Sequence, residues 1–368
     1  MRCRALIATS WCLCAIFGLW GLDPNVAKRL SRQEIQAGWL LLFDGESTFG
    51  WKTEGDVAVN GGRLIIGGNK ASRITCTTAW SDGELSAQYQ LIGTSGHVHV
   101  GNVGIPLSAP DTALDGVYTL QVTIAGGKPT AWQVTDPKMQ QRTGSLSPSE
   151  PPTTAPISIS VADNHQVVLH SLKFRPTNLK PIFNGKDLEG WKEVPGKKSK
   201  FTVTEKGELN ITNGPGDIQT VGEWDDFVLQ LEIFSHGKHL NSGVFFRCLP
   251  GEFWSGYEAQ VRNEWQGEDR SKPVDFGTGG LYNRQPARRV VSDDNEWFTM
   301  TVVAQGPHIA IWVNGFQTVD YTDTRPPAKS ARQGTKLTAG PISLQGHDPT
   351  TNLSFRNIRL AQLPKPKP

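Results

Sequence analysis

Apolar and polar residues alternate with a period of two, or form short apolar runs, along most of this 368-residue chain. The clearest strand patterns are Phe227–Ile233, Thr299–Ala304 and His308–Val313. The last leads into Asn314-Gly315, a pair that accepts positive φ and so predicts a two-residue hairpin turn. Only Arg29–Ala37 carries a weak helical period. Many strands with almost no helix predict an all-β fold built from β-sandwiches.

The chain also repeats itself. Leu42-Phe43-Asp44-Gly45 leads to Trp51, and Ile182-Phe183-Asn184-Gly185 leads to Trp191, with eight positions from Phe to Trp in both copies. Further segments match in the same order: Val57–Ile66 with Phe201–Ile211, Leu85–Leu91 with Phe227–Ile233, Gly116–Val122 with Gly256–Val261, and Val167–Phe174 with Leu353–Leu360. The repeat predicts two tandem domains, 38–176 and 180–362, with a short link at Arg175–Asn178.

The first copy is shorter. Gln121 to Leu172 spans 51 positions, whereas the matching interval Gln260 to Ile358 spans 98. We therefore expect the first domain to lack both the Gly279–Tyr282 segment and the Asn314-Gly315 hairpin, and to carry a Ser/Thr/Pro-rich loop over 143–156 instead. Setting Gln121 against Gln260 puts Thr119 where the second domain has Glu258, so we expect the first domain to be catalytically silent.

Composition narrows the function classes. Charged residues make up 20% of the chain and the formal net charge is +2, without clusters of Lys and Arg, so a nucleic-acid partner is not expected. The 39 Gly and 24 Pro fit many short strands. The 12 Trp fit buried cores, and they also fit a protein that stacks aromatic rings on sugars.

The first 27 residues have the pattern of a signal peptide. Arg2 and Arg4 precede an apolar run, Ala5–Leu19, that is too short to span a membrane. We expect export to the periplasm or the extracellular space, with no spanning segment in the mature protein. Of the five cysteines, only Cys76 and Cys248 lie beyond this leader, and we expect both to be buried free thiols.

The C-terminal half resembles the 3-keto-disaccharide hydrolase family. The resemblance rests on six ordered motifs: IFNGKDLEGW (182–191), NSGVFFR (241–247), GYEAQV (256–261), GTGGLY (277–282), the strand pair 296–315, and GPISLQGHDP with FRNIRL (340–360). It implies two tandem concanavalin-like jelly-roll sandwiches and hydrolysis of glycosides already oxidised at C3, with 1,2-elimination and hydration as the two steps. The chain departs from the family at Arg262-Asn263, where relatives often carry Asp.

The implied chemistry needs three kinds of group. A ketone at C3 acidifies the C2 proton, so a base can remove that proton and the C1 substituent can leave. A donor must hold the enolate oxygen, and an acid must protonate the leaving group.

Glu258 is the candidate base, because it shares a strand face with Gln260 in GYEAQV. His347, in a loop after a strand, and Tyr282, after a Gly-rich approach, are the other catalytic candidates. The alternatives are a solvated strand carboxylate, a locally bonded turn His and a core Tyr. We expect Glu258, His347, Tyr282 and Arg247 to converge on one pocket with a Trp at its rim.

The residues that we expect to bind the substrate are Arg247, Gln260, Asn241 and Trp254. Arg247 ends the NSGVFFR strand, where a cation could hold the keto or enolate oxygen or simply pair with Glu258. Asn241 opens the same motif. Trp254 lies in a loop with Phe253, and together with Trp265 these rings could form a stacking platform.

No cofactor is identified, and the role of a divalent cation such as Ca²⁺ stays open. His97 and His99 share a strand face, and His236 and His239 are close in sequence, but no third metal ligand is identifiable. The leading hypothesis is an enzyme acting on a carbohydrate substrate. The alternatives are a non-catalytic, lectin-like carbohydrate-binding protein and a structural module of the cell surface.

Overall fold

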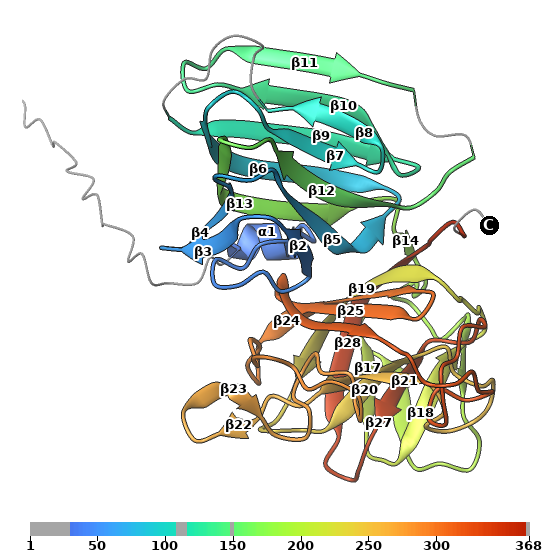
Figure 1. The fold of residues 1–368 in the computed structure, drawn as a ribbon. Helices are drawn as coiled ribbons and strands as arrows, with labels where there is room; N and C mark the ends of the chain where they lie inside the picture. Colours follow the sequence, from blue (N-terminus) through green and yellow to red (C-terminus); the bar gives the residue numbers. More distant parts are fainter. Residues whose placement is uncertain (1–29, 108–115, 148–150, 366–368) are drawn as a thin grey trace, which may run out of the picture.

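The computed structural model describes residues 30–107, 116–147 and 151–365. Two β-sandwiches follow one another along the chain, and one lies above the other in Figure 1. The only helix among these residues is α1 (Arg32–Gln36), capped by Ser31, where the weak helical period lies. The proposed signal peptide lies outside the described residues. Within them, no helix is long and apolar enough to cross a membrane. The all-β, two-sandwich fold expected from the sequence is confirmed.

In the first sandwich an eight-stranded sheet faces a five-stranded sheet. The larger has the order β11-β10-β9-β6-β13-β4-β3, with β1 also on β13, and the smaller has the order β2-β5-β12-β7-β8. The strands are β1 (Leu40–Leu41), β2 (Trp51–Glu54), β3 (Val57–Asn60), β4 (Arg63–Gly67), β5 (Ser72–Trp80), β6 (Gly83–Ile92), β7 (His97–Val100), β8 (Val103–Pro106), β9 (Tyr118–Ala125), β10 (Lys128–Thr135), β11 (Gln141–Ser145), β12 (Ala155–Val161) and β13 (Gln166–Pro176).

The second sandwich repeats this arrangement. Its sheets have the orders β26-β25-β24-β19-β28-β17-β16, with β14 on β28, and β15-β18-β27-β20-β21. The strands are β14 (Lys180–Pro181), β15 (Trp191–Glu193), β16 (Lys200–Val203), β17 (Leu209–Thr212), β18 (Gly216–Thr220), β19 (Phe227–Ser235), β20 (Ser242–Phe246), β21 (Tyr257–Val261), β24 (Trp297–Gln305), β25 (His308–Val313), β26 (Phe316–Thr322), β27 (Ser343–Gly346) and β28 (Asn352–Gln362). A small hairpin, β22 (Trp265–Gln266) with β23 (Asp269–Pro273), is added outside both sheets.

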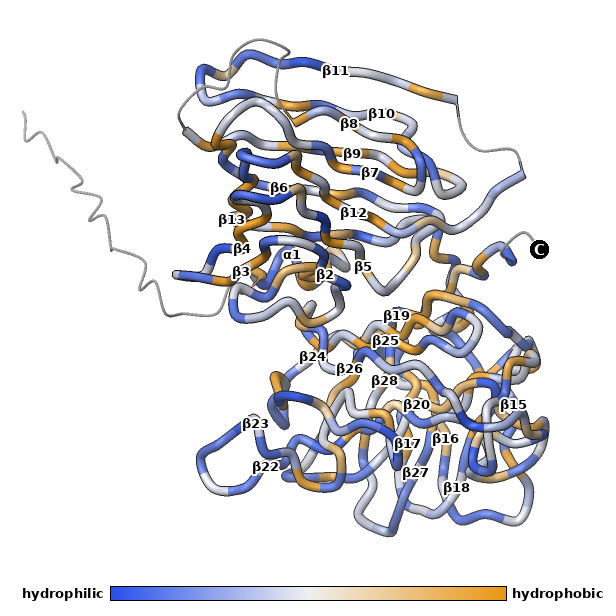
Figure 2. The backbone as a smooth tube through the Cα atoms, in the orientation of Figure 1, coloured by the Kyte–Doolittle hydropathy of each residue, from blue (hydrophilic) through white to orange (hydrophobic). Residues whose placement is uncertain are grey.

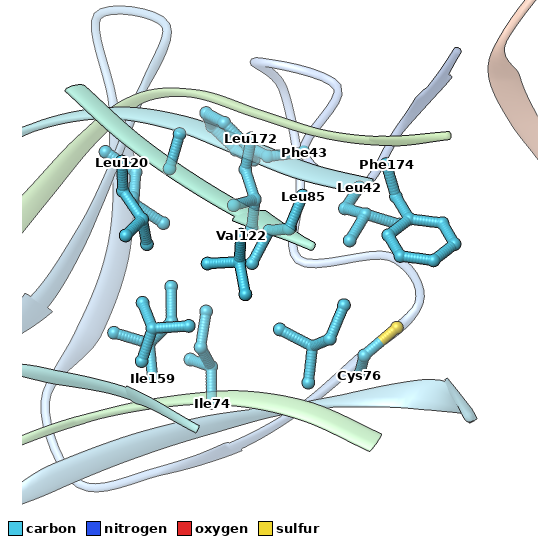
Figure 3. Close-up of a cluster of buried hydrophobic side chains, with 14 of the residues drawn as sticks. Leu42, Phe43, Ile74, Cys76, Leu85, Leu120, Val122, Ile159, Leu172 and Phe174 are labelled. Carbon is cyan, nitrogen blue, oxygen red and sulfur yellow. The ribbon is translucent and has the colours of Figure 1, made fainter. Parts of the chain in front are cut away.

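Each core lies between its two sheets. In the first sandwich, Ile74 and Ile159 point from the smaller sheet toward Leu120 and Val122 of the larger one (Figure 3). The hydropathy-coloured tube shows apolar stretches along the inner strands and polar ones at the outer loops (Figure 2). Cys76 and Cys248 are both buried free thiols, as expected.

The repeated opening has a structural purpose. The indole Nε1 of Trp51 donates to the carbonyl of Leu42, and Nε1 of Trp191 donates to the carbonyl of Ile182. Each Trp is buried, so its indole nitrogen needs an internal acceptor, and the fixed spacing supplies it.

The identical strand orders correct two expectations. The match of Gly116–Val122 with Gly256–Val261 is wrong, because β9 belongs to the larger sheet and the counterpart of β21 is β8. The first sandwich also has a counterpart of the Asn314-Gly315 hairpin, namely the β10–β11 turn, so Thr143–Ser145 ends a strand and is not loop. What the first sandwich lacks is the long excursion 262–296 between β21 and β24.

The first sandwich covers one face of the second. Val228, Val303, Ala310 and Trp312 project outward from the larger sheet of the second sandwich and join the core of the first. The ring of Trp312 lies 5.8 Å from that of Trp80. At the edge of the contact, Arg288 and Arg289 pair with the carboxylates of Asp44 and Glu46.

Trp312→Ala should therefore destabilise the whole protein. Its side chain is 1% exposed, and its indole donates to the carbonyl of Leu41 at 3.2 Å. Deleting a buried Trp costs about 3–5 kcal/mol, so calorimetry should show a clear fall in melting temperature. The control Trp254→Ala removes a side chain that is 42% exposed and should have a much smaller effect. Equal melting temperatures for wild type and Trp312→Ala would contradict the view that this contact between the sandwiches stabilises the protein.

Candidate active site

A polar sheet face forms the floor of the candidate site. On the smaller sheet of the second sandwich, Ile218, Leu344, Val244 and Ala259 point into the core. Because strand side chains alternate between faces, their neighbours point out. These outward residues are Asp217 and Gln219 on β18, Ser343 and Gln345 on β27, and Glu258 and Gln260 on β21.

A pocket of about 230 Å³ lies over this floor. It is lined by Pro215, Asn241, Phe253, Trp254, Glu258, Gln260, Asp275, Tyr282, Gln345 and His347. Six of the seven residues selected from the sequence therefore meet in one place, with Trp254 among them. Their chemical roles remain predictions.

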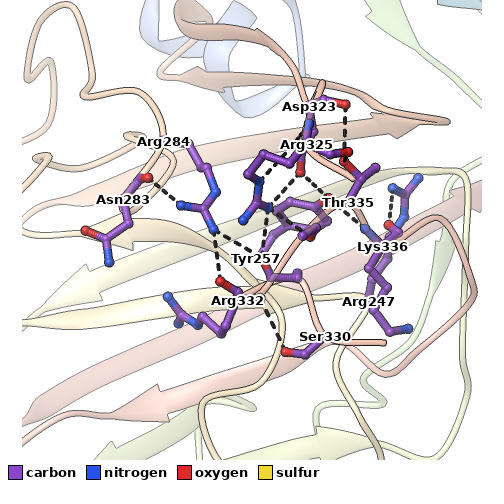
Figure 4. Close-up of polar contacts among 12 residues, drawn as sticks. Arg247, Tyr257, Asn283, Arg284, Asp323, Arg325, Ser330, Arg332, Thr335 and Lys336 are labelled. Atoms are coloured by element: carbon purple, nitrogen blue, oxygen red, sulfur yellow. Dashed lines mark hydrogen bonds and ion pairs between the residues drawn. The ribbon is translucent and has the colours of Figure 1, made fainter. Parts of the chain in front are cut away.

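Arg247 does not join them, and the expectation that it binds substrate is wrong. Its side chain is 0% exposed and pairs with Asp226 at 2.9 Å. It also donates to the carbonyls of Asp225 and Gly306, and to that of Lys336 (Figure 4). Arg247 comes just after β20 with φ at 51°, so the strand alternation that would have placed it no longer applies.

Glu258 is a deeply buried carboxyl group at the base of the pocket. The residue is 4% exposed, and Nη2 of Arg332 donates to its Oε2 at 2.7 Å. Burial raises the pKa of Glu258 to about 7, although the Arg332 guanidinium acts in the opposite direction. Gly243, opposite Gln260 on β20, leaves the space that this carboxyl occupies, because a Cβ there would lie 2.8 Å from Oε1.

Arg332 was not found by sequence reasoning. Its guanidinium carbon lies 4.0 Å from the centre of the Trp254 ring, and its Nε donates to the Trp254 carbonyl. It comes from the loop between β26 and β27, which has no strand pattern. Two contacts to Asp323 fix the start of that loop. The Tyr257 hydroxyl donates to Asp323 at 2.7 Å, and Arg325 binds the same carboxylate (Figure 4).

Asp275 is a second residue that the sequence did not single out. Its Oδ2 accepts from Nε2 of Gln260 at 3.0 Å and from Nδ2 of Asn241 at 3.2 Å. It also lies 3.4 Å from Nη1 of Arg262. Arg262 belongs to the Arg262-Asn263 pair, where relatives often carry Asp. A carboxylate thus reaches this part of the pocket from a different position in the chain.

Three amide oxygens at the site accept no hydrogen bond from the part of the chain that the structure describes. Oδ1 of Asn241, Oε1 of Gln260 and Oε1 of Gln345 are buried without a hydrogen bond from the described residues. Buried polar atoms are costly when unpaired, so they suit a ligand that donates hydrogen bonds. The hydroxyl groups of a sugar are such donors.

Asp217 supports the aromatic rim. It is 1% exposed, and its Oδ2 accepts from the backbone amide of Trp254 at 2.9 Å. Burial raises the pKa of Asp217 to about 6. Trp254 has φ at 56°, a conformation uncommon for a bulky residue, and the bond to Asp217 helps to hold it.

Tyr282 and His347 complete the pocket. Burial, followed by the charges of Asp275 and Glu258, raises the pKa of the Tyr282 phenol, so it stays a proton donor. Nδ1 of His347 faces Oδ2 of Asp348 at 3.0 Å, which orients the ring. Among the described residues no three or more His, Cys, Asp or Glu side chains are grouped to hold a metal ion.

The same face of the first sandwich carries different residues. Strand pairing aligns Lys52, Thr75, Ser158, His99 and Gly104 in one row. In the second sandwich the matching row is Lys192, Gln219, Ser343, Phe245 and Glu258. The counterpart of Glu258 is therefore Gly104, not Thr119.

The sequence of the second sandwich matches a known family. The model of the 3-keto-alpha-glucoside-1,2-lyase-like domain matches residues 178–361, half of the chain. The chain belongs to this family. Carbohydrate-directed hydrolase or lyase chemistry follows at the level of the family. No curated protein gives a significant match to the chain.

Solved structures of similar shape include two proteins from Parabacteroides distasonis that are provisionally described as glycosyl hydrolases. One is 21% identical, with 50% of this chain and 94% of that chain covered and a TM-score of 0.42. Another is 27% identical, with 51% and 85% covered and a TM-score of 0.40. A carbohydrate-binding module from Bacillus subtilis is 16% identical over 49% and 99%, with a TM-score of 0.36. Scores of this size assign no function.

Replacing Arg332 should shift the titration of Glu258. Arg332→Gln removes the cation that favours the ionised carboxylate, so the pKa of Glu258 should rise above about 7. Carboxyl ¹³C NMR over pH 5–9 measures this. Arg356→Gln, which removes a cation paired with Glu232 on the other sheet, is the control and should leave Glu258 unchanged. An unaltered titration in Arg332→Gln would mean that this pair does not set the pKa.

Proposed function

We propose that the second sandwich cleaves 3-keto-glycosides, with Glu258 as the base. The observation that carries this proposal is a carboxyl group with a pKa of about 7 inside a sugar-sized polar pocket. A base is most effective when its pKa lies near the working pH, because it is then both ionised and able to accept a proton.

In the first step the Glu258 carboxylate removes the proton from C2. The C–H electron pair forms the C2=C3 bond, and the ketone oxygen becomes an enolate that the Tyr282 hydroxyl can bind. The enolate oxygen then re-forms the C3=O bond, the C2=C3 π pair moves to form the C1=C2 bond, and the C1–O bond breaks with its electrons going to the departing oxygen. His347, oriented by Asp348, protonates the departing oxygen.

Water completes a net hydrolysis. It adds through oxygen to C1 of the enone, while its proton goes to His347 and Glu258 returns a proton to C2. The products are the 3-keto sugar and the released alcohol, and both residues recover their starting states. Amide groups of Asn241, Gln260 and Gln345 would hold the sugar hydroxyls.

A second candidate is carbohydrate binding without catalysis. The exposed indole of Trp254 and the neighbouring Phe253 favour it, because aromatic rims also serve lectin-like sites. The sheet face of the first sandwich has Gly104 in place of the base, so we propose that the first sandwich is catalytically silent.

Glu258→Gln in the full chain separates the two candidates. The amide keeps the shape of the side chain but cannot accept the C2 proton, so turnover of a 3-keto-disaccharide should fall about 10²- to 10⁴-fold. Binding, followed by calorimetry, should persist. Glu232→Gln, on the other sheet, should keep full activity. Full activity in Glu258→Gln would show that the base lies elsewhere, and binding without turnover in wild type would favour the lectin-like alternative.

We also propose that the protein is exported through its leader. The arginines at 2 and 4 and the apolar run after them motivate this proposal. N-terminal sequencing of the mature protein from a secreting host should give a start between about residues 15 and 28. A cytoplasmic product that begins at Met1 would overturn it.

A further inference from the structure

A cluster of basic and hydroxyl side chains occupies the face of the first sandwich that corresponds to the active-site face of the second. Arg73 comes from β5, His97 and His99 from β7, and Ser158 and Ser160 from β12. Strand pairing places Ser158 beside His99, and Ser160 beside both Arg73 and His97. The strands β5, β12 and β7 lie next to one another in Figure 1.

The cluster is compact and partly buried. Nη2 of Arg73 donates to Oγ of Ser158 at 2.7 Å, and Nε2 of His99 lies 2.8 Å from Oγ of Ser160. The two imidazole rings are 5.9 Å apart. The His99 ring packs directly over Gly104, where a Cβ would lie 3.1 Å from it.

The Arg73 guanidinium makes no ion pair within the described part of the chain, although Glu54 is its strand partner. No carboxylate there forms an ion pair with Arg73, His97 or His99. The charged residues that face it from the neighbouring strand are Lys52 and Glu54, both exposed, and Glu54 makes no ion pair with Arg73. Burial, then the charges of Arg73 and His97, lowers the pKa of His99.

The charge on this sheet face differs in sign between the two sandwiches. Where the second sandwich has Asp217, strand pairing places Arg73, and where it has Glu258 it places Gly104. The corresponding sheet faces thus carry carboxylates in the second sandwich, and one guanidinium with imidazoles and hydroxyls in the first. A guanidinium flanked by imidazoles and hydroxyls is the donor set that fits oxygens of negative charge.

We propose that this face of the first sandwich binds an oxyanion, namely a sulfate, phosphate or carboxylate group. The anion would accept hydrogen bonds from Arg73 and from the imidazoles, and its charge would pair directly with the guanidinium. The group can arrive as a free ion or attached to an anionic sugar. This site is separate from the pocket around Glu258 and does not depend on the reaction proposed there.

Calorimetry on the full-length protein at pH 6 and low ionic strength tests the proposal with inorganic sulfate, inorganic phosphate, glucuronate and glucose. Wild type should bind at least one of the anions and not glucose. Arg73→Gln should weaken that binding about tenfold or more, since hydrogen bonds to charged groups are the strong ones. The matched control Arg63→Gln removes an exposed cation on β4 of the same sandwich and should leave binding unchanged.

Two further measurements keep the result decisive. His97→Gln should also weaken binding, which covers the case in which Arg73→Gln fails to fold. Affinity for sulfate or glucuronate, whose charge is constant over this range, should increase from pH 8 to pH 5.5, because protonated imidazoles attract the anion and a bound anion raises the pKa of His99. Stronger binding of glucuronate than of the inorganic ions would identify an anionic sugar, and the reverse would identify a free ion. Absence of anion binding in wild type, or equal binding in Arg73→Gln, would overturn the proposal.

Discussion

The candidate site depends on two opposing effects on the carboxyl group of Glu258: its burial away from water, and its contact with the guanidinium of Arg332. Glu258 is 4% exposed, and burial alone would strongly favour its neutral form. The bond from Arg332 offsets part of that effect and leaves the pKa at about 7. Without the cation the carboxyl would stay protonated near neutral pH, and without the burial it would be too weak a base to be useful.

The residues around Glu258 hold Arg332 in contact with its carboxyl group. Arg332 reaches the carboxyl only because its loop is tied down by Asp323, which binds both Tyr257 and Arg325. Tyr257 is the strand neighbour of Glu258 and points to the opposite face, so one strand anchors the loop and presents the base. Arg332 also stacks on Trp254, which links the base to the aromatic rim.

The two sandwiches share the residues that build the fold and differ in the residues that could carry chemistry. Their sheets have the same strand order, and both bury the Trp that follows the Phe-x-Gly opening. The larger sheet of the second sandwich presents Trp312 and its apolar neighbours to the first, so the first contributes to the stability of the second. Residues that point outward from the smaller sheets do not take part in this contact, and they differ between the sandwiches: carboxylates in the second, and Arg73 with two imidazoles in the first.

The all-β class, the repeat and most of the pocket residues could be predicted from the pattern of residues along the chain. The period of two fixes which residues share a face, and so Glu258 and Gln260 could be placed together. Repeat matching failed for Gly116–Val122, because strands of both sheets have similar patterns and only the pairing shows that β8 corresponds to β21. Arg247 failed because the chain leaves the strand conformation there. Arg332, Asp275 and the pKa of Glu258 were decided by the tertiary structure alone, since they depend on which loops fold over the sheet and on how much water they exclude.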